Sequence, residues 1–81
     1  MTAAAELRAK ALEFAAAGRP AEAAKFLHRA LRALPVDVAD IEAISLRIRV
    51  LATLGYTEAE AGSVPDGLVH LGTAHALASG L

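Results

Sequence analysis

The residues that could do chemistry are few, and their spacing does not indicate a metal site. The histidines are His28, His70 and His75, and the last two stand five positions apart, on different sides of a helix. A metal site on one helix needs two ligands three or four positions apart, with carboxylates nearby, whereas no Asp or Glu follows Asp66. We therefore interpret the histidines as surface or packing residues, and expect no metal ion and no cofactor.

Catalysis by a nucleophile or by paired acids finds no support either. No serine or threonine stands beside a base at a spacing typical of a catalytic dyad, and no glycine-rich phosphate loop is present. Glu58 and Glu60 are two positions apart, so on a helix their side chains diverge. We interpret them as part of a solvated face and expect that the chain is not an enzyme.

The charge balance argues against a nucleic-acid partner. Eight Lys and Arg stand against nine Asp and Glu, a net charge of −1, whereas proteins that neutralise phosphates are strongly basic. Lys25, Arg29 and Arg32 form a small basic ridge, which we interpret as a solubilising feature. The charge is unevenly distributed, because every basic residue lies at or before Arg49 and no charged residue follows Asp66.

Targeting and membrane signals are not visible in the sequence. The N-terminal residues lack a basic region followed by an apolar core. The longest stretch without charged residues, 67–81, is shorter than the roughly 20 residues that span a bilayer. No cysteine is present. We expect a cytoplasmic protein without a membrane partner.

The composition predicts a single all-α domain over residues 1–81. Hydrophobic residues make up 56% of the chain but aromatics only 4%, so alanine and leucine dominate, and both favour helix. Turn glycines at Gly18 and Gly62, each followed by a proline, separate the helices of two hairpins. The expected helices are about Ala3–Ala17, Pro20–Leu34, Ala39–Ala61 and Pro65 to the stop at Gly80.

Apolar periodicity predicts which face of each helix is buried. The third helix carries two apolar stripes, so we expect it to be covered from two sides. Gly55 in its interior costs about 1 kcal/mol relative to alanine, and we expect another helix to cross closely there. The predicted inner residues are Leu7, Ala11, Phe14 and Ala15; Ala23, Leu27, Ala30, Leu31 and Leu34; Ile41, Ile44, Ile48, Leu51 and Gly55, with Leu46, Val50 and Leu54; and Leu68, Leu71, Ala74 and Leu77.

An offset of 44 residues superimposes the second half of the chain on the first. Gly18 then matches Gly62, Ala23 matches Gly67, and further matches of large and small residues are Leu7 with Leu51, Ala11 with Gly55, Leu27 with Leu71 and Ala30 with Ala74. This pattern predicts two repeated helical hairpins, at about 3–35 and 39–80.

The order of large residue, small residue, turn glycine, small, large and small resembles the tetratricopeptide (TPR) repeat family. The sequences AAAGRPAEAAKFLHRALRALP and LATLGYTEAEAGSVPDGL also resemble the helical N-terminal arrays of actinobacterial CHAT-domain (caspase-like) proteins. Departures from the TPR pattern are Lys10, Glu58 in place of an aromatic, Ser79 in place of a proline, and a period about ten residues too long. The TPR resemblance implies two antiparallel hairpins stacked as a short right-handed α-solenoid.

The resemblance also implies a function, because the first helix of each TPR hairpin lines a groove that holds a partner segment. The implied groove positions are Arg8, Leu12, Ala15, Arg49, Ala52, Tyr56 and Glu60, with Ala5, Ala16 and Ala59 beside them. Arg8 and Leu12 replace the Lys and Asn with which some members clamp a terminal carboxylate. We therefore expect a non-catalytic scaffold module that binds a protein or peptide partner.

Two other arrangements stay open. The chain could form a homo-oligomer or continue a longer repeat array, since the last helix carries no charge after Asp66. A structural homodimer is the alternative to the binding module. It would pair either through the third helix, using Ile41, Ile44, Ile48 and Leu51, or through the apolar C-terminal helix.

Overall fold

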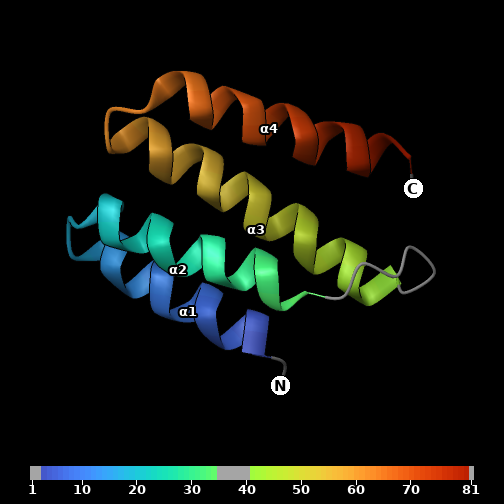
Figure 1. Ribbon diagram of the computed structural model, residues 1–81, viewed down its shortest axis with the longest axis horizontal. Helices are drawn as coiled ribbons and strands as arrows, with labels where there is room; N and C mark the ends of the chain where they lie inside the picture. The colour runs from blue at the N-terminus through green and yellow to red at the C-terminus, as the bar shows by residue number, and fades with distance from the viewer. Residues whose placement is uncertain (1–2, 35–40, 81) are drawn as a thin grey trace.

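The computed structural model describes residues 3–34 and 41–80. This part of the chain forms four α-helices and contains no strand (Figure 1). The all-α prediction is confirmed for these residues, and the observed helix ends lie within a few residues of the predicted ones. Ala39, the expected start of the third helix, lies outside the described residues. The helices are α1 (Ala3–Ala16), α2 (Pro20–Ala33), α3 (Ile41–Glu60) and α4 (Val64–Ser79).

The helices pack in chain order, as two antiparallel hairpins side by side (Figure 1). α1 packs against α2 and α3 against α4, while α2 and α3 join the hairpins. Within the described residues, α3 is the helix that contacts each of the other three. Four stacked helices are consistent with a repeat array, and the right-handed solenoid stays a prediction.

Both hairpins turn in the same way. Gly18 and Gly62 adopt left-handed φ angles of 79° and 96°, which glycine accepts without a steric penalty. After each glycine, the backbone N–H donates to a carbonyl five residues back, Arg19 to Phe14 at 2.9 Å and Ser63 to Glu58 at 2.8 Å. This is the hydrogen-bond pattern of a Schellman motif. The 44-residue offset therefore appears in the backbone as well as in the residue types.

The end of α2 follows from the proline that comes after it. Leu34 leaves the helix with φ −79° and ψ 138°, an extended conformation, because a following proline disfavours the helical region. Its side chain still points into the core. The buried cluster between α1, α2 and α3 consists of Ala4, Ala11, Ala23, Leu27, Ala30, Leu34, Val50 and Leu54, and its members beyond Ala4 were all predicted as inner residues.

Two phenylalanines join the helices of the first hairpin. Phe14 on α1 and Phe26 on α2 are stacked, with ring centroids 5.2 Å apart and planes at 17°. Arg19 lies 5.6 Å from the Phe14 ring and Arg29 lies 5.3 Å from the Phe26 ring. Stacking and cation–π contacts each add on the order of 1 kcal/mol beyond apolar burial, so this cluster stabilises the first hairpin specifically.

Two glycines allow α3 and α4 to approach closely. A Cβ atom on Gly55 would lie 2.5 Å from Leu71 Cγ and 2.8 Å from the Gly67 carbonyl oxygen, and one on Gly67 would lie 2.5 Å from the Gly55 carbonyl oxygen. α3 continues as a helix through Gly55. The predicted close crossing is therefore confirmed, and Gly67 is the residue of α4 that faces Gly55.

Two predicted core residues are exposed. Leu68, expected on the inner face of α4, is 63% exposed. The inner face is centred on Gly67, Leu71 and Ala74, and a residue one position after Gly67 is rotated by about 100° around the helix. Ile41, expected in a buried stripe of α3, is 68% exposed. The first residue of α3 is therefore not covered by other helices, and burial of the helix begins farther along it.

Two glycine-to-alanine substitutions test the crossing. Gly55→Ala should lower the free energy of unfolding by about 1–3 kcal/mol, because the cost of overpacking exceeds the gain in helix propensity. Gly72→Ala should instead raise it by about 0.5–1 kcal/mol, because no atom lies within 4 Å of a Cβ placed there. Urea unfolding followed by circular dichroism measures both. Equal effects at the two sites would contradict a tight crossing.

Candidate functional site

A groove of about 380 Å³ lies between α1 and α3, and all seven predicted groove residues line it. Thr53 and Thr57 complete the lining, whereas Ala5, Ala16 and Ala59 do not take part in it. The structure thus brings together side chains that are up to 52 positions apart in the sequence. The groove is lined by Arg8, Leu12 and Ala15 from α1, and by Arg49, Ala52, Thr53, Tyr56, Thr57 and Glu60 from α3.

Helix geometry gives the groove a basic end and an acidic end. Three- and four-residue steps place the α1 and α3 lining residues on one face of each helix. α1 and α3 run in the same direction, because α2 returns between them (Figure 1). Arg8 and Arg49, the first lining residue of each helix, therefore lie toward one end of the groove, and Glu60 lies at the other.

The two arginines are available to a ligand. Among the described residues, neither Arg8 nor Arg49 lies within 4 Å of a carboxylate, whereas Arg19 does pair with Glu22. Nε of Arg8 is buried and has no hydrogen-bond partner in this part of the chain. A buried donor without a partner is costly, by about 1–3 kcal/mol.

The middle of the groove is apolar and aromatic. Leu12 and Tyr56 are large exposed side chains, and Ala52 lies between the polar ends. Thr53 donates its hydroxyl to the Arg49 carbonyl at 2.8 Å, and Thr57 donates to the Thr53 carbonyl at 2.7 Å. Because both hydroxyl protons are used within α3, the arginines and the tyrosine are the donors that the groove offers to a ligand.

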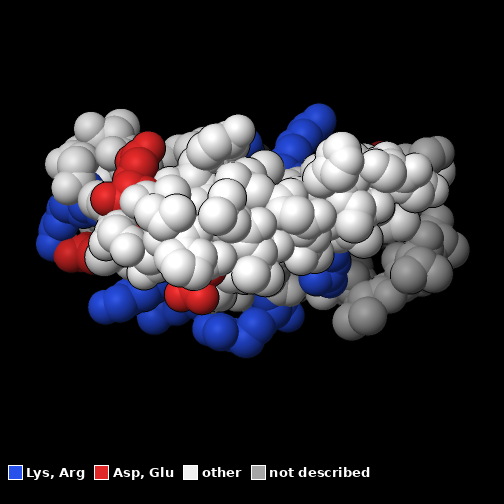
Figure 2. All heavy atoms as spheres, turned by 90° about the horizontal axis from the view of Figure 1, so that it is seen from above, with Lys and Arg blue, Asp and Glu red and all other residues white. Residues whose placement is uncertain are grey.

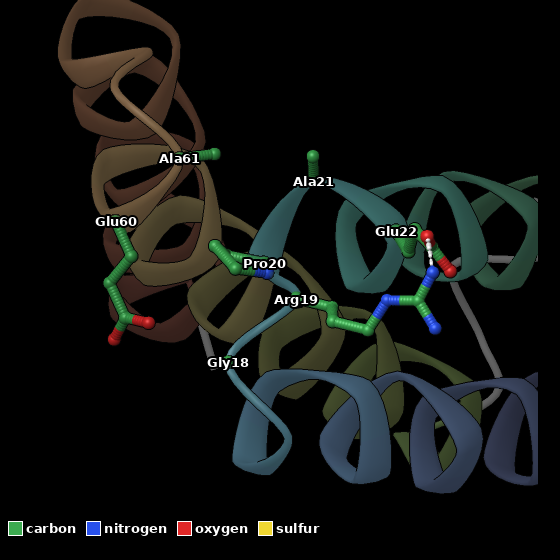
Figure 3. A pocket seen from close by; sticks show the side chains of 7 residues that line it. All are labelled: Gly18, Arg19, Pro20, Ala21, Glu22, Glu60 and Ala61. Carbon is green, nitrogen blue, oxygen red and sulfur yellow. Dashed lines mark hydrogen bonds and ion pairs between the residues drawn. The ribbon is translucent and has the colours of Figure 1, made fainter.

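A second hollow lies between the two hairpin turns and offers less chemistry (Figure 3). It has a volume of about 460 Å³ and is lined by residues 18–22, Glu60 and Ala61. Arg19 is held by Glu22, and the Glu60 side chain points away from that pair. This leaves no convergent polar groups, so we take the groove between α1 and α3 as the candidate site.

A buried polar cluster joins the hairpins on another side of α3. Glu58 is only 8% exposed, and His70 of α4 donates through Nδ1 to its carboxylate. Nε2 of His28 on α2 lies 3.9 Å from the same carboxylate, and the two imidazole rings meet edge to face at 5.7 Å. The prediction that Glu58 belongs to a solvated face is wrong, because the divergence from Glu60 points Glu58 inward.

The repeat offset contains the signal that could have revealed this cluster. Glu58 occupies the position of Phe14, and His70 that of Phe26. The stacked aromatic pair of the first hairpin is thus replaced by a hydrogen-bonded polar pair in the second. Both members of the pair change together, which a residue-by-residue search for catalytic spacing does not detect.

The described residues contain neither a cluster of metal-ligand side chains nor a membrane-spanning helix. No group of three or more His, Cys, Asp or Glu side chains in 3–34 and 41–80 is arranged to hold a metal ion. No helix in these ranges is both long and apolar enough to cross a bilayer.

Removing the buried carboxylate should destabilise the fold. Glu58→Ala leaves the donor of His70 without its acceptor in a half-buried site, and should lower the free energy of unfolding by about 1–3 kcal/mol. Glu60→Ala, two residues away and exposed, should change it by less than about 0.5 kcal/mol. Chemical denaturation of both variants makes the comparison. An equal loss for Glu60→Ala would contradict the buried role of Glu58.

Replacing both partners should cost much less than removing one. The double variant Glu58→Phe, His70→Phe copies the aromatic pair of the first hairpin, and apolar replacement of a whole polar pair is often neutral or stabilising. We expect it to unfold at or above the denaturant midpoint of Glu58→Ala. A double variant less stable than Glu58→Ala would show that the two hairpins do not pack equivalently at this position.

Comparison with known proteins returned no matching family model, no matching curated protein and no matching solved structure.

Proposed function

We propose that the chain is a TPR-like, non-catalytic protein-interaction module whose groove between α1 and α3 binds a partner peptide or helix. The repeated turn geometry at an offset of 44 residues supports the TPR-like part of this proposal. The assembly of all seven groove residues around one hollow supports the binding part. A scaffolding role and a cytoplasmic location, expected from the sequence, belong to the same proposal.

The observation that carries the proposal is the combination of exposed apolar side chains with two guanidinium groups that lie beside no carboxylate among residues 3–34 and 41–80. Arg and Tyr, together with Trp, are the residue types enriched at the interface positions that contribute most of the binding energy. Arg8 and Arg49 stand at one end, and Leu12 and Tyr56 follow them along the groove. A complementary partner carries Asp or Glu at one end of a short segment, followed by apolar residues that cover Leu12 and Tyr56.

The size of the groove indicates moderate affinity. A hollow of about 380 Å³ holds only a few side chains, and interfaces of low area belong to transient complexes. Exposed ion pairs contribute about 0–1 kcal/mol each, so the apolar contacts must supply most of the binding energy. The arginines then set the direction of the segment and the rate of encounter.

The non-catalytic part of the proposal rests on the chemistry of the lining. The groove holds no histidine, and its threonine hydroxyls donate to their own helix. A nucleophile needs a base within hydrogen-bond reach, and the one carboxylate in the lining, Glu60, lies toward the end opposite the arginines.

The alternative dimer through α3 is less favoured. Leu51 is only 6% exposed, and Ile44 and Ile48 are partly buried. Of the predicted stripe, Ile41 alone is widely exposed, so a symmetry mate would find one large side chain rather than four.

Selection from a displayed peptide library tests the groove without a known partner. The wild-type chain is panned with counter-selection on Arg49→Glu. We expect enriched peptides that combine acidic and apolar residues. Fluorescence anisotropy should show at least tenfold weaker binding, about 1.4 kcal/mol, to Tyr56→Ala and to Arg49→Glu.

Arg32→Glu is the matched control, because Arg32 is an exposed arginine of α2 that does not line the groove. It changes the net charge as much as Arg49→Glu does, and should leave affinity within about twofold. Peptides that bind Arg49→Glu and Tyr56→Ala as tightly as wild type would overturn the groove assignment. Added salt should weaken binding of acidic peptides, since exposed charges are screened.

A further inference from the structure

The walls of the groove between α1 and α3 have the residue spacing that receives another helix. The lining positions of α3 from Arg49 to Glu60 are related by steps of three and four residues, and those of α1 from Arg8 to Ala15 are related in the same way. Such positions form a ridge along each helix, and the furrow between two ridges accepts the ridge of a third helix.

We propose, building on the function proposed above, that the partner in this groove is an amphipathic α-helix that runs antiparallel to α1 and α3, with its C-terminal end at Arg8 and Arg49. The proposed function fixes neither the conformation nor the direction of the partner segment. The hydrogen-bonding groups of the lining decide the conformation, and the charges at the two ends of the groove decide the direction.

An extended segment would find few hydrogen-bond partners in the groove. Its backbone N–H and C=O groups need partners when they are buried, and both walls are helices, whose backbone groups bond within the helix. Thr53 and Thr57 donate their hydroxyl protons to carbonyls of α3. A partner helix bonds its own backbone internally, so it requires only side-chain contacts from the groove.

α2 shows how a helix fits between α1 and α3. It packs against both of them and runs antiparallel to both (Figure 1). No residue of α2 lines the groove, so α2 and the groove lie on different sides of the α1–α3 pair. A partner helix in the groove repeats on one side of that pair the arrangement that α2 has on the other.

The length and volume of the groove fit one face of a short helix. Arg49 and Glu60 are eleven positions apart, which is about 16 Å along a helix axis, or roughly three turns. A partner helix of that length presents roughly four side chains along one line of contact. The volume of about 380 Å³ therefore holds the side chains of that face, while the body of the helix lies above them.

The charges at the ends of the groove favour one direction. A helix carries partial positive charge at its N-terminus and partial negative charge at its C-terminus. Arg8 and Arg49 therefore attract the C-terminal end, and Glu60 attracts the N-terminal end. The dipoles of α1 and α3 act in the same sense, because antiparallel dipoles side by side attract. An acidic residue in the last turn weakens an isolated helix, and its contact with the two arginines offsets this in the complex.

The α4 side of the molecule lacks charged ends of this kind. Figure 2 looks onto that side and shows an uncharged surface over most of its extent, with charged side chains mainly near the edges. Residues 67–80 contain no Lys, Arg, Asp or Glu. The side chains of these residues therefore select no direction for a bound helix by charge, whereas the groove does.

Nuclear magnetic resonance of a bound peptide tests the conformation. The probe is the tightest-binding peptide recovered from the displayed library with counter-selection on Arg49→Glu, isotope-labelled and bound to the wild-type chain. We expect helical Cα chemical shifts over about three turns. Proline at a central peptide position that faces away from the groove should weaken binding at least tenfold relative to alanine there, because proline breaks a helix. Extended shifts, or proline tolerated as well as alanine, would overturn the helical partner.

A spin label at either end of the same peptide tests the direction, with the reduced, diamagnetic label as the control. A label at the peptide N-terminus should broaden the amide resonances of α3 around Glu60 more than those around Arg49. A label at the C-terminus should do the reverse. The opposite pattern, or equal broadening from both labels, would overturn the antiparallel direction.

A failure of binding and a failure of conformation give different results. If no peptide distinguishes the wild-type chain from Arg49→Glu and Tyr56→Ala, both the groove assignment and the helical partner are overturned. If peptides bind and depend on these two residues but are extended or reversed, the groove assignment stands and the antiparallel helix alone is overturned.

Discussion

The contact between Gly55 and Gly67 is the constraint on which the second hairpin depends. Neither position has room for a side chain, because a Cβ on either one would fall within 3 Å of the facing carbonyl oxygen. The two backbones therefore set the separation of α3 and α4, and the larger side chains fill the space on either side of that contact. Since α3 also packs on α1 and α2, the separation of α3 and α4 affects where the α3 side chains that line the groove lie. The same contact turns Glu58 toward His70 one turn farther along α3.

The two helices of the first hairpin pack through different residue types. At the equivalent positions it has Ala11 and Ala23, both fully buried, and one turn away the stacked Phe14 and Phe26. The second hairpin has smaller residues at the crossing and a polar pair beyond it. A buried carboxylate is tolerated only when hydrogen bonds satisfy it, and here one imidazole comes from α4 and a second approaches from α2. The exchange of an aromatic pair for a polar one thus links the hairpins as well as the helices within one of them.

Local signals were sufficient to predict the elements, because each boundary depends on one or two residues. Gly18, Gly62 and the prolines around them define the turns whatever the tertiary structure. The groove residues also came together, because the repeat register fixes which face of α1 meets which face of α3. It was harder to predict which residues beside the apolar stripes are buried. Leu68 satisfies an apolar period of three and four as well as Leu71 does, and only the glycine contact decides which stripe of α4 faces inward. Glu58 was misplaced for a similar reason, since its partners come from two other helices and no local pattern contains them.

Charged residues are distributed unevenly over the surface of the molecule. The α1 side carries exposed acids and bases and the groove has a basic and an acidic end, whereas residues 67–80 contain no Lys, Arg, Asp or Glu. A charged surface stays hydrated and resists close packing, because stripping water from a charge costs more than the contact returns. An uncharged face carries no such penalty. The two ends of the groove therefore differ in charge, whereas α4 exposes the large apolar side chains of Leu68 and Val69 to solvent.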